Sequence, residues 1–162
     1  MERKVRSATQ NDISKLIDVY SEWQKFKGIL PDQLIEVDTP EGLKKYFDGS
    51  NPTRIYLLAV DEAENPLGAC YIDTSFLGLS SIRLGNMMVK EKHRQQGVGS
   101  ILIDQVIHYA KENKVKKVWL WAQEELKTAV KLYESKGFIL EGRQKKQFCN
   151  KDALLLGLVL SE

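Results

Sequence analysis

The segment from residue 87 to residue 102, MMVKEKHRQQGVGSIL, carries residue types suited to binding phosphate. An apolar run leads into a polar turn containing Gly97 and Gly99, where an amphipathic helix is expected to begin. Glycine lacks a Cβ, so the backbone can approach a ligand closely, and the unpaired amides of a first helical turn attract an anion. Arg94 adds a cation. The segment therefore predicts an anion site at a helix start.

A second motif, LYESKGF, occupies residues 132–138. The first segment fits neither the P-loop, which needs Lys-Ser/Thr after its last glycine, nor the dinucleotide pattern G-x-G-x-x-G. Together the two motifs resemble those of the GNAT-type N-acetyltransferases, which carry Arg/Gln-x-x-Gly-x-Gly/Ala after the fourth strand and Leu-Tyr-Glu-x-x-Gly-Phe after a later helix. Residues 94–99 and 132–138 match these motifs in order and spacing.

The resemblance implies acetyl-CoA as co-substrate and no metal. It implies that the CoA pyrophosphate lies on backbone amides of the glycine turn, and that pantetheine and the thioester lie along free backbone groups of the fourth strand. The cofactor-binding residues expected from it are Met87, Met88, Val89, Arg94, Gln95, Gln96, Gly97, Val98, Gly99 and Ser100.

Tyr133 matches the tyrosine that in many relatives points at the CoA sulfur and can protonate the leaving thiolate. A tyrosine with a pKa of about 10 can donate this proton without a perturbed pKa. The alternative is a core tyrosine on the apolar stripe of its helix. Both interpretations stay open at this point.

The general base is not identified by the motifs. Relatives that use an acid on the fourth or fifth strand would place it at Arg83 or Trp121, and neither side chain can act as a base. Asp73, Glu22 and His93 remain as candidates, although a surface role explains each equally well. A water chain without a dedicated base is the favoured alternative.

Four further positions depart from patterns in the resembling family. Some polyamine-acetylating relatives carry an acidic pair where this chain has Gly85 and Asn86, which argues against polyamines. Gln95 replaces a common glycine in the motif. Leu126 replaces a common asparagine and removes a side-chain hydrogen bond to pantetheine.

Hydrophobic periodicity and turn residues predict the elements that position these motifs. Helices are expected over residues 9–23, 39–47, 97–112 and 124–135, with Asn113 as a left-handed cap. Strands are expected over residues 5–8, 54–60, 67–74, 81–89, 117–121, 138–148 and 153–160. Tyr20 and Trp23 are core residues or a substrate wall, and residues 26–38 form a lid, a recognition segment or a plain connection.

A helix separates the strands at 81–89 and 117–121, so these strands should be parallel. With the resemblance, the fold class is α/β (α+β). We expect a mixed, mostly antiparallel sheet of about six to seven strands, a splayed parallel pair at its centre and about four flanking helices.

The whole chain of 162 residues fits one domain, residues 1–162. Its 24 Lys and Arg against 22 Asp and Glu leave a net charge of +2, which argues against nucleic acid. Cys70 and Cys149 form no C-x-x-C pair, which favours a reduced, intracellular protein. No run approaches the roughly 20 apolar residues of a membrane span, and none resembles a signal peptide. A cytoplasmic protein is predicted.

The predicted function is transfer of acetyl from acetyl-CoA to a primary amine, on a small molecule or a protein, by direct attack in a ternary complex. A covalent route is not supported because both cysteines lie outside the motifs. The alternative is an acyl-CoA-binding sensor or scaffold without turnover, suggested by the acids missing at Arg83 and Trp121. The resemblance also makes a homodimer an expectation. The identity of the amine is not indicated.

Overall fold

A computed structural model describes residues 2–28, 30, 39–148 and 150–161. They form one seven-stranded sheet in the order β1-β2-β3-β4-β5-β7-β6, in which only β4 and β5 are parallel neighbours. The predicted fold class is confirmed. The strands are β1 (Arg3–Ser7), β2 (Arg54–Asp61), β3 (Pro66–Asp73), β4 (Ser81–Val89), β5 (Lys117–Gln123), β6 (Ile139–Phe148) and β7 (Lys151–Val159).

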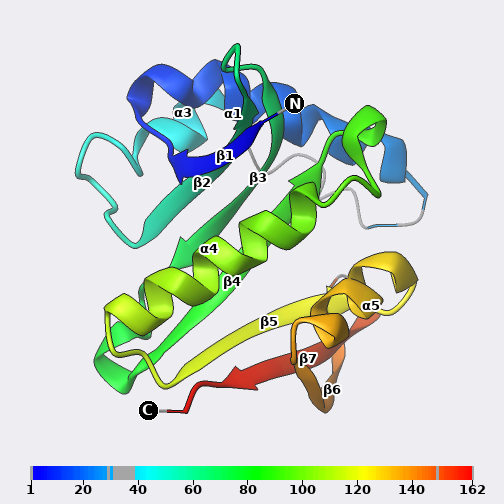
Figure 1. Ribbon diagram of the computed structural model, residues 1–162. Coiled ribbons are helices and arrows are strands. Elements are labelled where there is room, and N and C mark those ends of the chain that lie inside the picture. The colour runs from blue at the N-terminus through cyan, green and yellow to red at the C-terminus, as the bar shows by residue number, and fades with distance from the viewer. Residues whose placement is uncertain (1, 29, 31–38, 149, 162) are drawn as a thin grey trace.

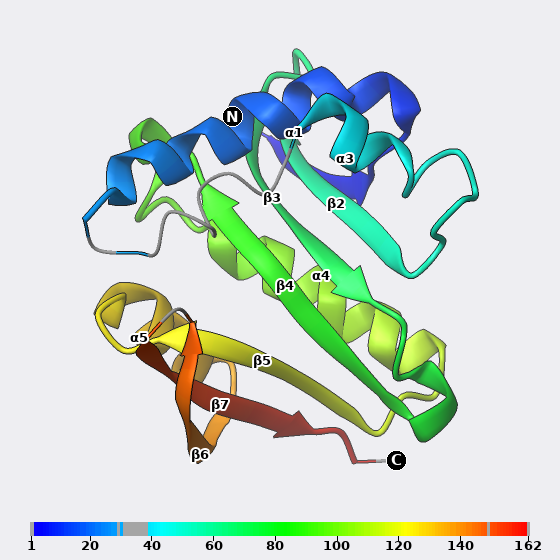
Figure 2. The ribbon, with the colours of Figure 1, turned by 180° about the vertical axis from the view of Figure 1, so that it is seen from behind.

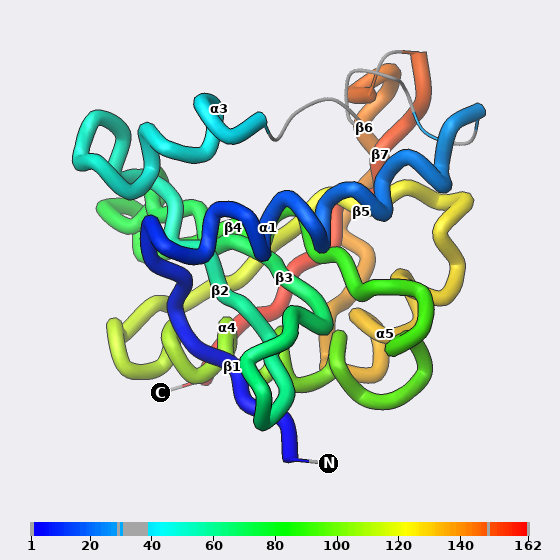
Figure 3. The backbone as a smooth tube through the Cα atoms, turned by 90° about the horizontal axis from the view of Figure 1, so that it is seen from above, coloured from blue at the N-terminus to red at the C-terminus, as the bar shows by residue number. Residues whose placement is uncertain are grey.

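Four α-helices in the described ranges pack on the two faces of this sheet: α1 (Ile13–Tyr20), α3 (Pro40–Lys44), α4 (Val98–Glu112) and α5 (Lys127–Ser135). Helices α4 and α5 lie on the face turned to the viewer in Figure 1. Helices α1 and α3 cover the opposite face, as Figure 2 and the view from above in Figure 3 show. No helix in the part of the chain that the structure describes is long and apolar enough to cross a membrane.

Each face of the sheet has its own apolar core because successive strand residues point to opposite faces. On β5, Val118, Leu120 and Ala122 belong to the core shared with α4 and α5. Trp119, Trp121 and Gln123 alternate with them and therefore face the side of α1 and α3. The side-chain pattern of β5 thus prepares an aromatic surface on that second face.

Two predicted helix starts have the expected capping residues, whereas α1 ends at Tyr20, α3 ends at Lys44 and α5 begins only at Lys127, each inside the predicted range. The backbone amide of Thr9 donates to Asp12 at 2.9 Å, and Thr39 Oγ1 accepts from the Gly42 amide at 3.0 Å. The prediction of Asn113 as a left-handed cap is wrong, because its φ is −94° and Lys114 takes the positive φ of 55° instead. Asn113 donates its side-chain amide to the carbonyl of Tyr109 at 2.9 Å.

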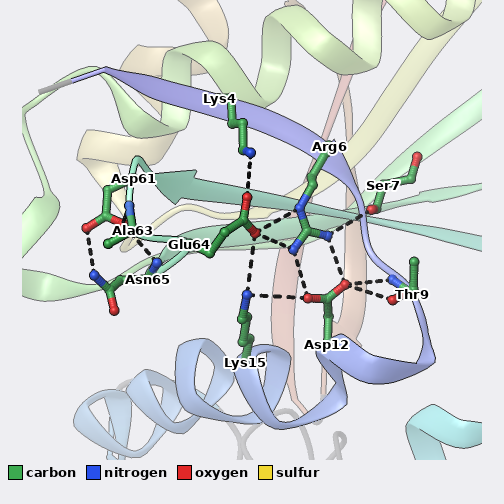
Figure 4. Close-up of polar contacts among 10 residues, drawn as sticks. All are labelled: Lys4, Arg6, Ser7, Thr9, Asp12, Lys15, Asp61, Ala63, Glu64 and Asn65. Carbon is green, nitrogen blue, oxygen red and sulfur yellow. Dashed lines mark hydrogen bonds and ion pairs between the residues drawn. The ribbon is translucent and has the colours of Figure 1, made fainter.

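A cluster of charges ties β1, α1 and the β2–β3 turn together (Figure 4). Arg6 donates to both oxygens of Asp12 at 2.8 and 2.9 Å, and also to Glu64 at 2.7 Å. The hydrogen bonds from Arg6 lower the pKa of Asp12, which is only 5% exposed, well below its ordinary value. Lys4 and then Arg6 lower the pKa of Glu64 to about 2. This cluster fixes the start of α1 against the sheet edge.

Replacing Asp12 by Asn should lower the free energy of unfolding by about 2 kcal/mol at pH 7, because a hydrogen-bonded charge is removed from Arg6. A depressed folded-state pKa contributes stability above the unfolded-state pKa and loses it as the pH falls toward the folded-state value. The deficit of Asp12→Asn should therefore be constant above pH of about 5 and shrink below about 4, in denaturant titrations at several pH values.

The control is Asp18→Asn, which removes an ion pair to Lys90 on a half-exposed carboxylate. Its effect should stay within about 0.5 kcal/mol. A deficit for Asp12→Asn that is the same at pH 7 and pH 2 would contradict the assigned source of stability.

Candidate active site

The parallel strands β4 and β5 pair over a short stretch and then separate. Their partners run from Ser81 and Lys117 to Arg83 and Trp119, after which each strand continues without the other. Figures 1 and 2 show them diverging from a common end. The predicted splayed pair is therefore present, and it leaves backbone groups on both strands without a partner.

A β-bulge in β4 accompanies this separation. Between its pairs with Tyr71 and Ala69 of β3, the β4 chain advances from Gly85 to Met88 and so contains one residue more than β3. Asn86, within the bulge, has a φ of 40°. A bulge bends a strand and increases its twist, which turns the end of β4 away from β5.

A cavity of about 110 Å³ lies between the separated strands. Tyr133 and Ala129 of α5 line it from one side of the sheet, and Trp23 and Leu30 contribute from the segment after α1. None of the lining residues in the described ranges is charged: Trp23, Leu30, Leu84, Asn86, Met87, Trp121, Ala122, Gln123, Leu126, Ala129, Tyr133 and Phe148. A small molecule inside would meet aromatic and neutral polar groups.

The turn before α4 presents a row of free backbone donors. The amides of residues 95–100 have no hydrogen-bond acceptor in the described part of the chain. Gly97 has a φ of 84°, and an added Cβ would meet nothing within 4 Å. These amides lie at the positive end of the 15-residue helix α4, where an anion is stabilised by the helix dipole. The turn therefore fits a phosphate group.

Two other residues of this turn are explained by local conformation and packing. A Cβ on Gly99 would lie 2.8 Å from the side chain of Leu132, so glycine there lets α4 approach α5. Gln95, at the position where glycine is common in relatives, adopts a φ of 57°. That left-handed conformation costs a non-glycine residue about 1 kcal/mol. Gly97 is thus the glycine of this turn whose missing side chain leaves open space for a ligand.

Arg94 uses its guanidinium inside the protein. Its Nε donates to the carbonyl of Val89 at 2.9 Å, and Nη2 donates to the carboxylate of Glu22 at 3.2 Å. Glu22 is 9% exposed and also accepts from the Glu91 amide at 3.1 Å and from Lys25. Arg94 therefore anchors the end of β4 to the 3₁₀ helix at residues 21–26, and its own backbone amide donates to the carbonyl of Glu91 at 3.1 Å. Its part in cofactor binding stays a prediction.

None of the three candidate bases lines the cavity. The carboxylate of Glu22 is engaged by two cations, as described above. Burial acts to raise the pKa of Asp73, but hydrogen bonds from Ser75 and Arg83 outweigh it, so its pKa lies below the ordinary value. Burial and nearby lysines lower the pKa of His93. The geometry favours none of them as a base acting within the cavity.

Tyr133 is both a core residue and part of the cavity lining, so its position fits both interpretations, a packing role and a role next to the thioester. It belongs to the core beneath α5, is 7% exposed, and packs edge-on against Phe138 with ring centroids 5.9 Å apart. It also lines the cavity, and its hydroxyl has no hydrogen-bond partner within the described residues. Burial raises the pKa of Tyr133, so the hydroxyl keeps its proton and remains a donor.

The cysteine that the structure describes lies in the core of the sheet. Cys70 is completely buried in β3, and this burial raises the pKa of its thiol, which makes it a poor nucleophile. Cys149 lies outside the described residues. Within the described ranges, no three or more His, Cys, Asp and Glu side chains come together as a metal site would require.

The second face of the sheet supplies the aromatic walls. Tyr20 is a core residue, whereas Trp23 lines the cavity, so the two aromatic residues of the first helical pattern have different roles. A Cβ on Gly85 would lie 2.1 Å from the ring of Tyr71, which fills the space where polyamine-acetylating relatives carry an acid. Of the predicted loop at 26–38, residues 29 and 31–38 lie outside the described residues.

Two lining residues, Gln123 and Phe148, are not predicted by the sequence motifs. Gln123 continues the alternation of Trp119 and Trp121, so an extension of the predicted strand by two residues would have placed it on the same face. Phe148 comes from the terminal hairpin, and only the insertion of β7 between β5 and β6 determines where it lies.

Glu22 is expected to hold the turn at residues 95–100 in place. Glu22→Gln removes a buried charge that holds Arg94 and the Glu91 amide, and it should lower the free energy of unfolding by about 2 kcal/mol. It should also weaken acetyl-CoA binding severalfold in a calorimetric titration, because the turn that carries the amides loses its anchor.

Glu91→Gln is the matched control, since Glu91 contacts the same Lys25 through a carboxylate that is 65% exposed. Its effect on stability should be within about 0.5 kcal/mol. Equal effects of the two variants would contradict an anchoring role for Glu22.

The chain is similar to known proteins both in sequence and in fold. A sequence model of the acetyltransferase (GNAT) family matches residues 18–138. The uncharacterised N-acetyltransferase YobR of Bacillus subtilis (strain 168) is 30% identical over 142 residues, which cover 84% of this chain and 54% of that protein. The chain thus spans about half the length of this curated relative.

Solved structures share the fold at low sequence identity. The PaiA N-acetyltransferase from Thermoplasma acidophilum in complex with coenzyme A aligns with a TM-score of 0.80 at 16% identity, over 99% of this chain and 100% of that one. The ribosomal-protein-alanine N-acetyltransferase from Brucella melitensis aligns with a TM-score of 0.80 at 22% identity, over 97% and 99% of the two chains. With a family match that covers most of its residues, the chain belongs to the GNAT acetyltransferase family.

Proposed function

We propose that this protein is an acetyl-CoA-dependent N-acetyltransferase that acetylates a primary amine by direct attack in a ternary complex. The observation that carries the proposal is the row of unpaired amides at residues 95–100, beside a cavity that opens between β4 and β5. A structural neighbour with this fold was solved with coenzyme A, which supports the choice of cofactor.

The residues present fit acetyl-CoA. The pyrophosphate would lie on the amides from Gln95 to Ser100, where Gly97 leaves open space. Pantetheine would follow the backbone of Met87, Met88 and Val89, which is unpaired on the side of β5. The thioester would then reach the cavity next to Tyr133.

The proposed reaction needs two donors from the chain, a backbone amide and a hydroxyl, and a path for one proton. The amine nitrogen attacks the thioester carbonyl carbon, the carbonyl oxygen becomes an oxyanion, and a free backbone amide of β4 would stabilise it. Removal of such a donor costs other enzymes about 3 kcal/mol. The C–S bond then breaks, the Tyr133 hydroxyl gives its proton to the leaving thiolate, and the proton released by the amine passes through water and restores the Tyr133 hydroxyl.

Some features stay predictions. Direct attack is preferred over a covalent route because Cys70 is buried within β3 and has a raised pKa. The sequence also predicts a small-molecule or protein acceptor, a homodimer, no binding of nucleic acid and a cytoplasmic location. The second candidate function, an acyl-CoA sensor without turnover, is favoured by the lack of a charged group in the described cavity lining.

Acetyl-CoA should raise the melting temperature, with about 2.7 kcal/mol of stabilisation at a hundredfold excess over Kd. Gly97→Ala should weaken this effect strongly, because a Cβ would enter the space over the turn. Gly49→Ala is a matched control, since Gly49 has a φ of 83° and equally open surroundings. Both variants should lose about 1 kcal/mol of stability from backbone strain, but only Gly97→Ala should lose cofactor affinity. No stabilisation by millimolar acetyl-CoA would refute the proposal.

Tyr133→Phe should lower kcat by about a hundredfold with an unchanged Kd for acetyl-CoA, because general-acid donation is lost and the ring is retained. Tyr109→Phe removes a hydroxyl on α4 away from the cavity lining and should leave kcat unchanged. Thiol release over a panel of amines, amino acids, antibiotics and peptides gives the readout. Acetyl-CoA binding without thiol release on any of them would favour the sensor.

A further inference from the structure

Gln123 is a buried amide without a partner in the cavity lining. It is 5% exposed, and neither its Nε2 nor its Oε1 has a hydrogen-bond partner within the described residues. Its side chain lines the space between β4 and β5. Buried amide groups are rarely left unpaired because their desolvation is not repaid. An unpaired amide in the wall of a cavity therefore points to a ligand that pairs with it.

Two indole groups in the same lining share this property. The Nε1 atoms of Trp23 and Trp121 are buried and have no partner in the part of the chain that the structure describes. An indole N–H only donates, whereas the Gln123 amide both donates and accepts. Apart from the Tyr133 hydroxyl, which is proposed to face the thiolate, these buried unpaired groups are mostly donors, with one acceptor at Gln123 Oε1. Such a set complements an amide group with its C=O and N–H.

The charges near the cavity are already compensated. Asp73 pairs with Arg83 at 2.7 Å, and the guanidinium of Arg83 lies over the ring of Trp121 at 5.1 Å from its centroid. Because a cation already lies over this ring, the aromatic wall offers little attraction to an ammonium group. No charged residue of the described ranges lines the cavity, so none there could pair with a carboxylate or an ammonium group of the acceptor. The part of the acceptor that enters should be neutral.

We infer that the acceptor is a primary amine adjacent to an amide group, as in an amino-acid amide or the N-terminus of a peptide, and that Gln123 pairs with this amide. The inference rests on the proposed function. An α-amino group has a pKa of about 8, compared with about 10.4 for lysine, so a useful fraction is neutral at neutral pH. Such an acceptor explains why the described cavity lining needs neither a carboxylate to bind ammonium nor a dedicated base.

The test is calorimetric titration of the protein saturated with CoA, using alaninamide, trialanine, alanine and putrescine. Alaninamide or trialanine should bind at least about tenfold more tightly than alanine and putrescine, because only they carry an amide. Tighter binding of trialanine would identify a peptide terminus, and tighter binding of alaninamide a small molecule. Alanine or putrescine binding as tightly as both amides, or no binding of either amide, would overturn the inference.

Gln123→Met keeps an unbranched side chain and removes both polar atoms. It should weaken alaninamide binding about tenfold or more, leave CoA affinity unchanged, and leave the melting temperature equal or higher because an unpaired amide is lost. Gln10→Met makes the same change at an exposed position near the far edge of the sheet and should alter nothing. Unchanged amide binding in a folded Gln123→Met would contradict the role of Gln123.

Gln123→Glu is the second variant, in case the methionine disturbs packing. It keeps the shape of glutamine, adds a negative charge, and should shift the binding preference from alaninamide toward putrescine. Thiol release tests the proposed function separately from the assignment of the acceptor. Alaninamide binding without release of thiol would refute the proposed function and leave the acceptor assignment, whereas thiol release with putrescine but not with either amide would overturn the assignment alone.

Discussion

The separation of β4 from β5 is the constraint on which the candidate site depends. Their ladder ends at Arg83 and Trp119, and the extra residue of the β4 bulge bends the strand away. Unpaired backbone groups in a protein interior are costly unless something else pairs with them. The unpaired backbone groups in the open centre of this sheet therefore either reduce stability or bind a ligand. The free amides at residues 95–100 lie at the same end of β4.

The opened sheet is held in place from both faces. On one face, Gly99 lets the start of α4 pack closely against Leu132 of α5. On the other, Glu22 reaches from the segment after α1 to Arg94 and the Glu91 amide. The turn at residues 95–100 is thus anchored to the segment after α1, which also contributes Trp23 to the cavity lining. A buried carboxylate with several donors tolerates little displacement.

On the face of the sheet covered by α1 and α3, Asp73 is paired with Arg83, and the cavity itself is lined by neutral groups in the described ranges. Arg83 neutralises Asp73 and lies over Trp121, while the ring of Tyr71 occupies the space above Gly85. Recognition in such a cavity depends on hydrogen bonds and shape. The neutral lining agrees with the sequence-based prediction against polyamines, whose recognition would need carboxylates. Without a base in the described lining, the protonation state of the amine itself becomes the relevant property.

The sequence by itself determined the elements and the family. Apolar periodicity predicted the strands and helices, and the motifs at residues 94–99 and 132–138 indicated a candidate phosphate-binding turn and Tyr133, because these properties depend on neighbours close in the chain. It failed at Asn113, where a side-chain bond to Tyr109 changed the cap. Tertiary structure alone decided that Arg94 and Glu22 are bonded to each other, that Gly99 meets Leu132, and that Gln123 lines a cavity with unpaired atoms. These facts depend on which distant segments pack together, and the local pattern of residue types does not contain that information.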